Sequence, residues 1–433
     1  MEHAVTLVKE KCKGCTTCIK QCPTEAIRVR RGRAIIIGER CIDCGQCIRV
    51  CTHHAKRAVH DSIERLADFR YTVALPAPAL YGQFRNLDDV NIVLAGLLHM
   101  GFDQVYEVSR GAEMLSVITR LTMEKERDDV PLISSACPAV VQLIRTRFPK
   151  LIGNIAKHMA PMEIAAIHAR EEAVAQSGLN SDQIGIFFIT PCPAKVTAIH
   201  APGHLHRPVI DGALSMAEVY RKLLDNMQRN NPPQLAQSGM MGIGWATSGG
   251  ESSALGVENH LAVDGIENVI RVLEDLEDGK IRQLDFLELN ACNQGCVGGC
   301  LTVENPYVAK ARIRQLSKHM PASDTSIDAD GVQHEKFLFH KPLQERPVWQ
   351  LSVDRTTAMA LYQKISALTE LLPGLDCGSC GTPCCRALAE DVALGYASEE
   401  DCIFRVRERM EDMTGTGADV YLPPPFRKGR EDK

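Results

Sequence analysis

Cysteine is the residue type in this 433-residue chain most able to do chemistry, and there are eighteen cysteines. Eight lie before residue 52, five between residues 137 and 300, and five between residues 377 and 402. Many are separated by two residues, a spacing at which neighbouring thiolates hold one metal ion or iron–sulfur cluster. Disulfides suit small secreted domains, whereas this chain is large and its N-terminal residues lack the order of a signal peptide. The grouping therefore predicts metal or cluster binding.

Two cysteine runs near the N-terminus have the pattern of bacterial ferredoxins. Residues 12–23 read CKGCTTCIKQCP, and residues 41–51 repeat the run as CIDCGQCIRVC, with Thr52 where proline is usual. In two-cluster ferredoxins the fourth cysteine of each run serves the other cluster. We therefore expect two 4Fe–4S clusters that act as an electron-transfer wire, and zinc is the alternative. The first would be held by Cys12, Cys15, Cys18 and Cys51, and the second by Cys41, Cys44, Cys47 and Cys22.

A further cysteine group lies near the C-terminus in the spacing C-x2-C-x4-C-x16-C. It resembles the small FeS domain of several redox assemblies, which implies a further 4Fe–4S cluster. Zinc is again the alternative, because four thiolates suit both metals. The expected ligands are Cys377, Cys380, Cys385 and Cys402, and Cys384 is a spare thiol.

Between these groups, strand and helix patterns alternate. Apolar runs at residues 71–80, 130–138, 184–192 and 284–292 predict buried parallel strands, and amphipathic patterns between them predict helices. This alternation predicts an α/β domain with parallel sheets. Cysteines follow three of the runs, where open α/β sheets place their ligands. In the last of these segments, glycines would let the backbone approach an inorganic group closely.

The segments ISSACPAVV, ITPCPAKV and LNACNQGCVGGC together resemble the signature segments of the iron-only (FeFe) hydrogenase catalytic domain. The resemblance implies an H-cluster, which is a 4Fe–4S cubane joined to a diiron unit carrying carbon monoxide, cyanide and azadithiolate. It implies that Lys195 hydrogen-bonds a cyanide and that Pro78 lines the site. Cys300 has no family ligand role, so we expect it to serve in packing. The implied cubane ligands are Cys137, Cys192, Cys292 and Cys296, with Cys296 as the bridge to the diiron unit.

The chain departs from the family pattern along the proton route. Ala136 stands where catalytic relatives have a proton-relay cysteine, and an alanine has no exchangeable proton. Such departures are similar to those of the sensory hydrogenases and predict low turnover with cluster ligation intact. The others are Ala160 for the relay serine, Ile118 and Thr119 where acids are usual, and Thr190 and Asn290 in place of methionines.

We therefore expect an α/β protein with a two-lobed FeFe hydrogenase catalytic domain and parallel sheets. A bacterial ferredoxin-like α+β domain and a small helical FeS domain would flank it. The expected boundaries are residues 1–62 for the ferredoxin-like domain, 63–320 for the catalytic domain, 321–355 for a linker, 356–412 for the FeS domain and 413–433 for a flexible tail.

The expected function is slow, reversible splitting of dihydrogen, in hydrogen or redox sensing. The alternatives are a metabolic ferredoxin-linked hydrogenase and a catalytically silent iron–sulfur binding or electron-transfer protein without the diiron unit. Expected partners are dihydrogen, protons, a ferredoxin or another redox protein, and a signalling partner. The net charge of −5 does not favour nucleic acid or anionic lipid. Apolar runs too short to cross a bilayer favour a cytoplasmic protein.

Overall fold

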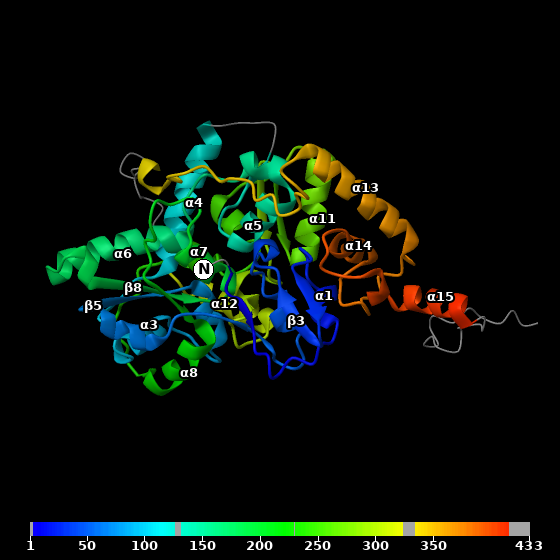
Figure 1. Ribbon diagram of the computed structural model, residues 1–433. Coiled ribbons are helices and arrows are strands. Elements are labelled where there is room, and N and C mark those ends of the chain that lie inside the picture. The colour runs from blue at the N-terminus through cyan, green and yellow to red at the C-terminus, as the bar shows by residue number, and fades with distance from the viewer. Residues whose placement is uncertain (1–2, 126–130, 229, 324–333, 415–433) are drawn as a thin grey trace, which may run out of the picture. The chain divides into compact units, whose positions relative to one another are not determined.

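The computed structural model describes residues 3–125, 131–228, 230–323 and 334–414 (Figure 1). The chain divides into two compact units. Unit 1 comprises Met1–Thr6, Cys41–Arg49 and Arg57–Arg346, and unit 2 comprises Leu7–Arg40, Val50–Lys56 and Pro347–Lys433. Most of the second ferredoxin-like run thus belongs to unit 1. The domain boundaries expected from the sequence stay a prediction.

A four-stranded parallel sheet lies in unit 1, in the order β6-β5-β8-β9. Its central strand β8 (Ile184–Thr190) is buried along its whole length, as expected for a strand covered on both faces. β5 aligns Tyr71 with Ile184, and its last residue Pro76 with Ile189. The other strands are β5 (Tyr71–Pro76), β6 (Gln104–Val105) and β9 (Gly212–Ser215).

A second parallel sheet of unit 1 has three strands in the order β10-β11-β7. Their bounds are β10 (His260–Asp264), β11 (Phe286–Asn290) and β7 (Leu132–Ile133). The four apolar runs of the sequence thus form β5, β7, β8 and β11, and all of them pair in parallel. This confirms the predicted α/β class with parallel sheets.

Helices of unit 1 connect these strands, and prolines open four of them in the first turn, where a missing N–H costs no hydrogen bond. The described residues include no helix that is long and apolar enough to cross a membrane. The helices are α2 (Gln46–Arg49), α3 (Asn91–His99), α4 (Val108–Lys125), α5 (Pro138–Arg147), α6 (Pro161–Ser177), α7 (Pro193–His200), α8 (Met216–Asn226), α9 (Met240–Gly244), α10 (Gly250–Leu255), α11 (Ile266–Glu277) and α12 (Pro306–Ser317).

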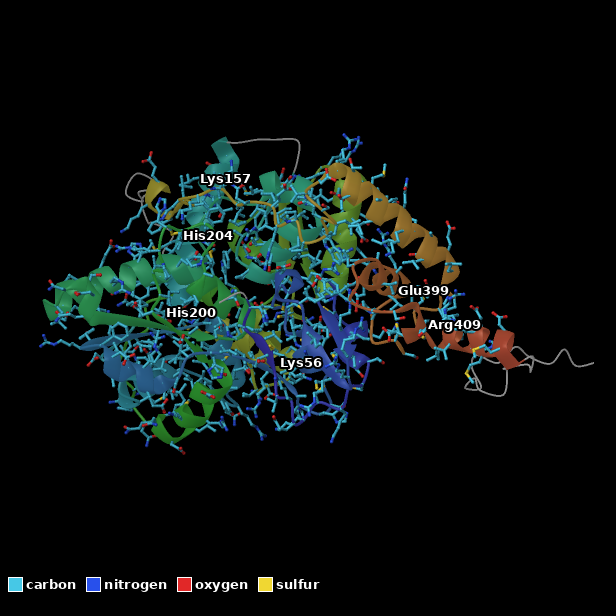
Figure 2. All side chains as sticks on the ribbon, in the orientation of Figure 1. Lys56, Lys157, His200, His204, Glu399 and Arg409 are labelled. Atoms are coloured by element: carbon cyan, nitrogen blue, oxygen red, sulfur yellow. The ribbon has the colours of Figure 1, made fainter. Side chains whose placement is uncertain are left out.

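Part of the segment predicted as a linker packs against the rest of unit 1. Phe337 is buried, and its carbonyl accepts a hydrogen bond from the Met159 N–H at 2.8 Å. The His204 ring, labelled in Figure 2, lies 4.4 Å from the Phe339 ring. Residues 324–333 of the predicted linker lie outside the described residues.

In unit 2, the antiparallel strands β2 and β3 form a hairpin, and an apolar cluster joins α13 to α14. The bounds are α1 (Thr17–Lys20), β2 (Ile27–Arg30), β3 (Arg33–Ile36), α13 (Arg355–Leu371), α14 (Cys385–Ala393) and α15 (Ile403–Thr414). Two further strands, β1 (Val5–Leu7) and β4 (Lys56–Ala58), pair with each other. The predicted tail spans residues 413–433; its first two residues belong to α15, and residues 415–433 lie outside the described residues.

Candidate cluster sites and pocket

Three predicted ligand segments start where parallel strands of unit 1 end. Cys137 follows β7 and occupies the N-cap position of α5. Cys192 follows β8 and occupies the N-cap position of α7. Cys292 follows β11, whose last residue is Asn290. These connections place the thiols beyond the carboxyl ends of the strands, where α/β sheets bind ligands.

Lys195, in the first turn of α7, lies among the thiols that the sequence grouped together. Its Nζ donates a hydrogen bond to the Ala136 carbonyl at 3.1 Å. Burial acts to lower the pKa of Lys195, but the negative charge of neighbouring thiolates outweighs burial and raises it. These thiolates belong to Cys296, Cys192, Cys137 and Cys292. One ammonium group thus interacts with all four predicted cubane ligands.

The thiols of this group fit a bound iron–sulfur cubane. Burial raises the pKa of Cys296 to about 11 and the pKa of Cys192 well above its usual value, and the charge of Lys195 opposes both shifts. The thiolate is the form that binds metal, and a bound metal makes up for the loss of the proton. Four thiols around one cation are a suitable donor set for an anionic 4Fe–4S cluster.

Two glycines bring the segment after β11 against neighbouring backbone. Gly295 has a φ of +85°, and a Cβ there would lie 2.5 Å from the Ser248 nitrogen. A Cβ on Gly299 would lie 2.1 Å from the Pro191 carbonyl oxygen. The Ser248 N–H also donates to the Gln294 carbonyl at 3.1 Å. Residues 247–250, which read TSGG, and the turn before Cys192 therefore contact the segment that carries Cys292 and Cys296.

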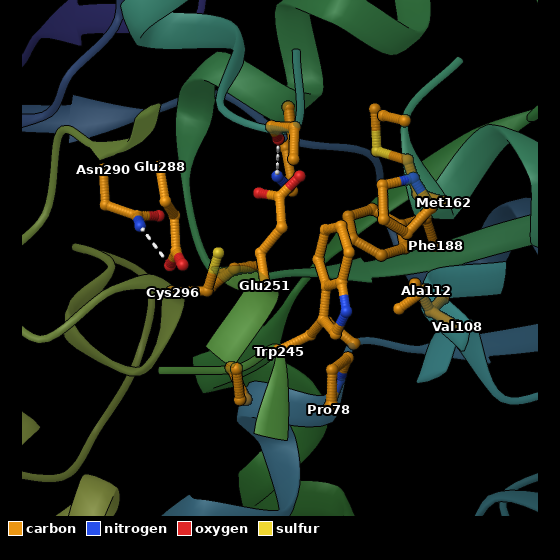
Figure 3. Close-up of a pocket in the computed structure, with 18 residues that line it drawn as sticks. Pro78, Val108, Ala112, Met162, Phe188, Trp245, Glu251, Glu288, Asn290 and Cys296 are labelled. Carbon is orange, nitrogen blue, oxygen red and sulfur yellow. Dashed lines mark hydrogen bonds between the residues drawn. The ribbon is translucent and has the colours of Figure 1, made fainter. Parts of the chain in front are cut away.

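A pocket opens beside Cys296 and encloses about 610 Å³, its open mouth included (Figure 3). Lys195, Pro78 and Ala136, the other residues predicted to act at this site, also line it. Most of the remaining lining is apolar, as in small-molecule sites. It includes Ala77, Val108, Ala112, Met162, Phe188 and Trp245.

Two glutamates also line this pocket, Glu288 from β11 and Glu251 from α10 (Figure 3). The Glu288 carboxylate accepts hydrogen bonds from the N–H groups of Gly249 and Ser252, both at 2.9 Å. It also accepts from the Ser252 hydroxyl and the Asn290 amide, both at 3.0 Å. Four donors thus hold the Glu288 carboxylate in place.

Glu251 has a different environment. Its carboxyl accepts a hydrogen bond from the Ser134 hydroxyl at 2.6 Å. Burial, reinforced by the negative charge of Glu288, raises the pKa of Glu251 well above its usual value. Its surroundings therefore favour the protonated form of Glu251.

Thr190 and Asn290, which replace methionines of the family pattern, take part in polar contacts. The Thr190 hydroxyl donates to the Cys192 carbonyl at 2.9 Å and accepts from the Cys192 N–H at 3.3 Å. It thereby holds the turn that carries this predicted ligand. Asn290 donates to Glu288, as described above.

The other residues that differ from the family pattern along its proton route have no ionisable side chain. Ala160 occupies the N-cap position of α6 and lines the pocket. Ile118 and Thr119 are buried in α4. A proton route would therefore need other groups, and Glu251 is a candidate.

Cys300 packs against the second ferredoxin-like run. A Cβ on Gly45 would lie 2.5 Å from the Cys300 sulfur, so the thiol lies directly on this backbone. Burial raises the pKa of Cys300 to about 12. These contacts agree with a packing role.

Arg49, which lies inside the same run, reaches a predicted cubane ligand. Its guanidinium donates to the Gly298 carbonyl and is hydrogen-bonded to Cys292. The charges of Cys300 and Cys44 also act on it. Arg49 thus lies between a predicted ligand of the second ferredoxin-like cluster, Cys44, and a predicted cubane ligand, Cys292.

Asp43 fixes the position of the second ferredoxin-like run. It is 3% exposed, and its carboxylate accepts from the Thr197 hydroxyl of α7 at 2.7 Å. The N–H groups of Ala4 and Val5 donate to its other oxygen. Asp43, Cys41 and His3 also place their possible ligand atoms within 4.8 Å of one another.

In unit 2, the structure brings Cys51 to the first ferredoxin-like run. Burial raises the pKa of Cys18, the charge of Lys56 lowers it, and the charges of Cys15, Cys12 and Cys51 raise it further. The Lys56 Nζ is buried and has no hydrogen-bond partner among the described residues. An unpartnered cation beside these thiols fits an anionic cluster. Cys51 thus lies with the first run, while the predicted exchange of fourth cysteines between the runs stays a prediction.

The predicted ligands of the second ferredoxin-like cluster are divided between the units. Cys41, Cys44 and Cys47 belong to unit 1, whereas Cys22 belongs to unit 2. The Cys22 sulfur accepts a hydrogen bond from the Ala26 N–H at 3.3 Å. This ligand set stays a prediction.

The C-terminal thiols gather around the apolar cluster of unit 2. Cys402 belongs to this cluster, and Cys377, Cys380 and Cys385 pack against it. The spare thiol Cys384 has a structural contact, since it caps α14 by accepting from the Ala387 N–H at 3.4 Å.

Sequence reasoning missed Glu251, Glu288, Asp43 and Arg49. Glu288 left a signal, because it is an acid inside an apolar run. Glu251 lies in residues 247–252, TSGGES, where the two glycines indicate only a turn. Asp43 and Arg49 lie inside a cysteine run that was interpreted only from the spacing of its cysteines.

Comparison with known proteins gives matches along most of the chain. A family model described as iron only hydrogenase large subunit, C-terminal domain, matches residues 70–256 and 215–300. A 4Fe-4S dicluster domain matches residues 11–56, and a family of Fe-S cluster segments matches residues 372–404.

Iron hydrogenase 1 from Clostridium pasteurianum is 24% identical over 222 residues, 48% of this chain and 38% of that protein. A structure of FeFe-hydrogenase HydA1 from Chlamydomonas reinhardtii matches with a TM-score of 0.50 and 16% identity, covering 66% of this chain and 97% of that chain. Another HydA1 structure has a TM-score of 0.49 and 15% identity, and the match covers 66% of this chain and 99% of that chain. The first of these structures indicates a shared fold.

Proposed function

Because the chain belongs to the iron-only (FeFe) hydrogenase family, we propose that it splits dihydrogen reversibly at low turnover, in hydrogen or redox sensing. The observation that carries this proposal is the pocket beside Cys296. Lys195 and Pro78 line it as the family resemblance implies, but Ala136 stands in the place of the relay cysteine. The ligand thiols are kept while one proton donor is missing. A sensor needs binding and a redox change rather than high flux.

In this proposal, four thiols would hold the cubane of the H-cluster, and Cys296 would be the ligand shared with the diiron unit. When bound, that unit would supply the Lewis acid and the base that split dihydrogen. Lys195 would donate a hydrogen bond to a cyanide and offset negative charge with its ammonium group. The apolar lining limits the access of water to the pocket. The four thiols belong to Cys137, Cys192, Cys292 and Cys296.

Glu251 takes the role of proton donor and acceptor in the pocket. Its raised pKa keeps a proton available, and the Ser134 hydroxyl orients the carboxyl. Glu288, which lines the same pocket, is a second proton carrier. Proton exchange by a positioned carboxyl is general acid–base catalysis.

Electrons would leave through three further 4Fe–4S clusters, two in the ferredoxin-like runs and one at the C-terminal cysteines. A ferredoxin or another small redox protein would take them up. A signalling partner would respond to the redox state of the chain. The buried Lys56 beside Cys18 supports the first of these clusters.

Infrared spectroscopy of the anaerobically matured chain tests the proposal. We expect bands of metal-bound carbon monoxide and cyanide that shift when hydrogen is added. A known hydrogenase matured in parallel is the positive control. If only the control shows bands, the silent electron-transfer alternative is correct. If the bands shift and turnover equals that of the control, the metabolic alternative replaces sensing.

A further inference from the structure

The C-terminal FeS segment of unit 2 is joined to the ferredoxin-like strand β2 by buried ion pairs. Asp391 of α14 is 6% exposed and binds Arg28 through both oxygens, at 2.8 and 3.2 Å. Arg30 donates to the same carboxylate at 2.5 Å. Arg40 pairs with the neighbouring Glu390. Buried pairs of this kind are costly to break singly, so they fix one arrangement of the two segments.

The loop that carries the C-terminal cysteines contacts the same segment directly. The Gly381 carbonyl accepts from the Val29 N–H at 2.8 Å, and the Cys380 carbonyl accepts from Arg30 at 3.1 Å. A Cβ on Gly381, whose φ is +80°, would lie 2.0 Å from the Val29 carbonyl oxygen. This loop therefore requires glycine to approach β2 so closely.

The loop also reaches the helix that carries a ferredoxin-like ligand. Lys20 of α1 donates to the Pro383 carbonyl at 3.0 Å. A Cβ on Gly378 would lie 3.0 Å from the Lys20 side chain and 3.6 Å from the Ile19 side chain. Gly378 follows Cys377 directly, and Ile19 follows Cys18. The segment that carries Cys377 thus packs against the helix that carries Cys18.

We propose that the C-terminal cluster exchanges electrons directly with the first ferredoxin-like cluster, so that the FeS segment is the terminal carrier of one electron path. One electron leaves the reduced first cluster and enters the oxidised C-terminal cluster, and no bond or proton is exchanged. The buried ion pairs of Asp391 and Glu390 hold the two clusters at a fixed separation. This inference rests on the clusters of the proposed function, but not on the diiron unit.

Low-temperature electron paramagnetic resonance of the full chain tests the exchange. The chain is reconstituted with iron and sulfide without oxygen and is reduced with dithionite. We expect magnetic interaction between the two clusters to broaden the spectrum, and Cys377→Ala to remove that broadening together with about four iron atoms per chain. A wild-type spectrum that equals a sum of independent clusters would overturn the proposal. Zinc at the C-terminal site would overturn it as well.

Asp391→Asn tests the ion pairs that join the FeS segment to β2. Arg30→Gln is a second variant that removes only one of these pairs. We expect hydrogen exchange at the Val29 amide to become about tenfold faster and the broadening to weaken, with iron content unchanged. Glu399→Gln is the matched control, because Glu399 pairs with Arg405 in the same segment. Unchanged Val29 exchange in both variants, or full broadening despite faster exchange, would contradict the inference. The infrared bands of the pocket test the proposed function separately.

Discussion

Glu251 lies in the pocket beside Cys296 with a raised pKa, while Glu288 next to it is stabilised by four donors. If Glu251 supplies protons to the pocket, Glu251→Gln should lower hydrogen turnover by about a hundredfold, because the amide has no acidic proton. The fold should be kept at pH 7, because the glutamine is neutral like the protonated acid. Turnover of matured protein and its infrared bands measure the two effects.

The effect of Glu251→Gln can also be measured in a chain that carries Ala136→Cys. A cysteine at this position would supply a second proton donor, so it should raise turnover and reduce the loss caused by Glu251→Gln. Glu274→Gln, on the exposed surface of α11, is a control for adding an amide elsewhere. Equal losses in the alanine and cysteine backgrounds would show that Glu251 acts through structure rather than proton delivery.

At the scale of elements, Asp61 connects the segment before β5 to β9 and α7. Its carboxylate accepts from the Ala213 N–H at 2.7 Å and from Arg65 at 2.7 Å, and the His200 Nε2 lies 2.8 Å away. Burial acts to raise the pKa of Asp61, but these contacts, that of His200 first, lower it to about 2. A lowered pKa means that the contribution to stability is complete above the unfolded value of 3.8 and is lost as pH falls toward 2.

Asp61→Asn should therefore lower the free energy of unfolding by about 2 kcal/mol at pH 7. The difference from wild type should shrink as pH falls below about 4, because the wild-type carboxylate then becomes protonated. Denaturant unfolding, followed by circular dichroism at several pH values, measures this difference in the free energy of unfolding. Asp68→Asn, at an exposed acid that also faces Arg65, is the control. A difference as large at pH 3 as at pH 7 would contradict this account.

Local patterns predicted the parallel strands and the place of Cys137 and Cys192 directly after two of them. Strand ends followed by Cys-Pro are visible in the sequence, because the proline marks the first turn of the next helix. The partners of Glu288 lie up to 39 residues away, and Arg49 contacts Gly298 across 249 residues. No local pattern encodes such contacts. The fold class was therefore predictable, while the acids of the pocket and the cation beside its ligands were not.

Across the whole molecule, predicted cluster thiols are accompanied by single cations. Lys195 interacts with the cubane thiols, Lys56 with Cys18, and Arg49 with Cys292. The chain carries a net charge of −5, and bound clusters would add negative charge. Nearby charge is one of the factors that set the reduction potential of a cluster. We therefore expect these cations to influence the proposed electron path as well as the fold.

Arg49 gives the sharpest test, because it stands between ligands of two predicted clusters. Arg49→Gln removes a positive charge that stabilises the reduced, more negative state of each. An interaction of about 1 kcal/mol corresponds to a fall in potential of roughly 40 mV for one electron. Redox titration monitored by electron paramagnetic resonance should show this fall, whereas Arg271→Gln, at an exposed position of α11, should leave the potentials unchanged. Equal potentials in the wild type and Arg49→Gln would mean that this arginine serves only to pack the segment Cys41–Arg49.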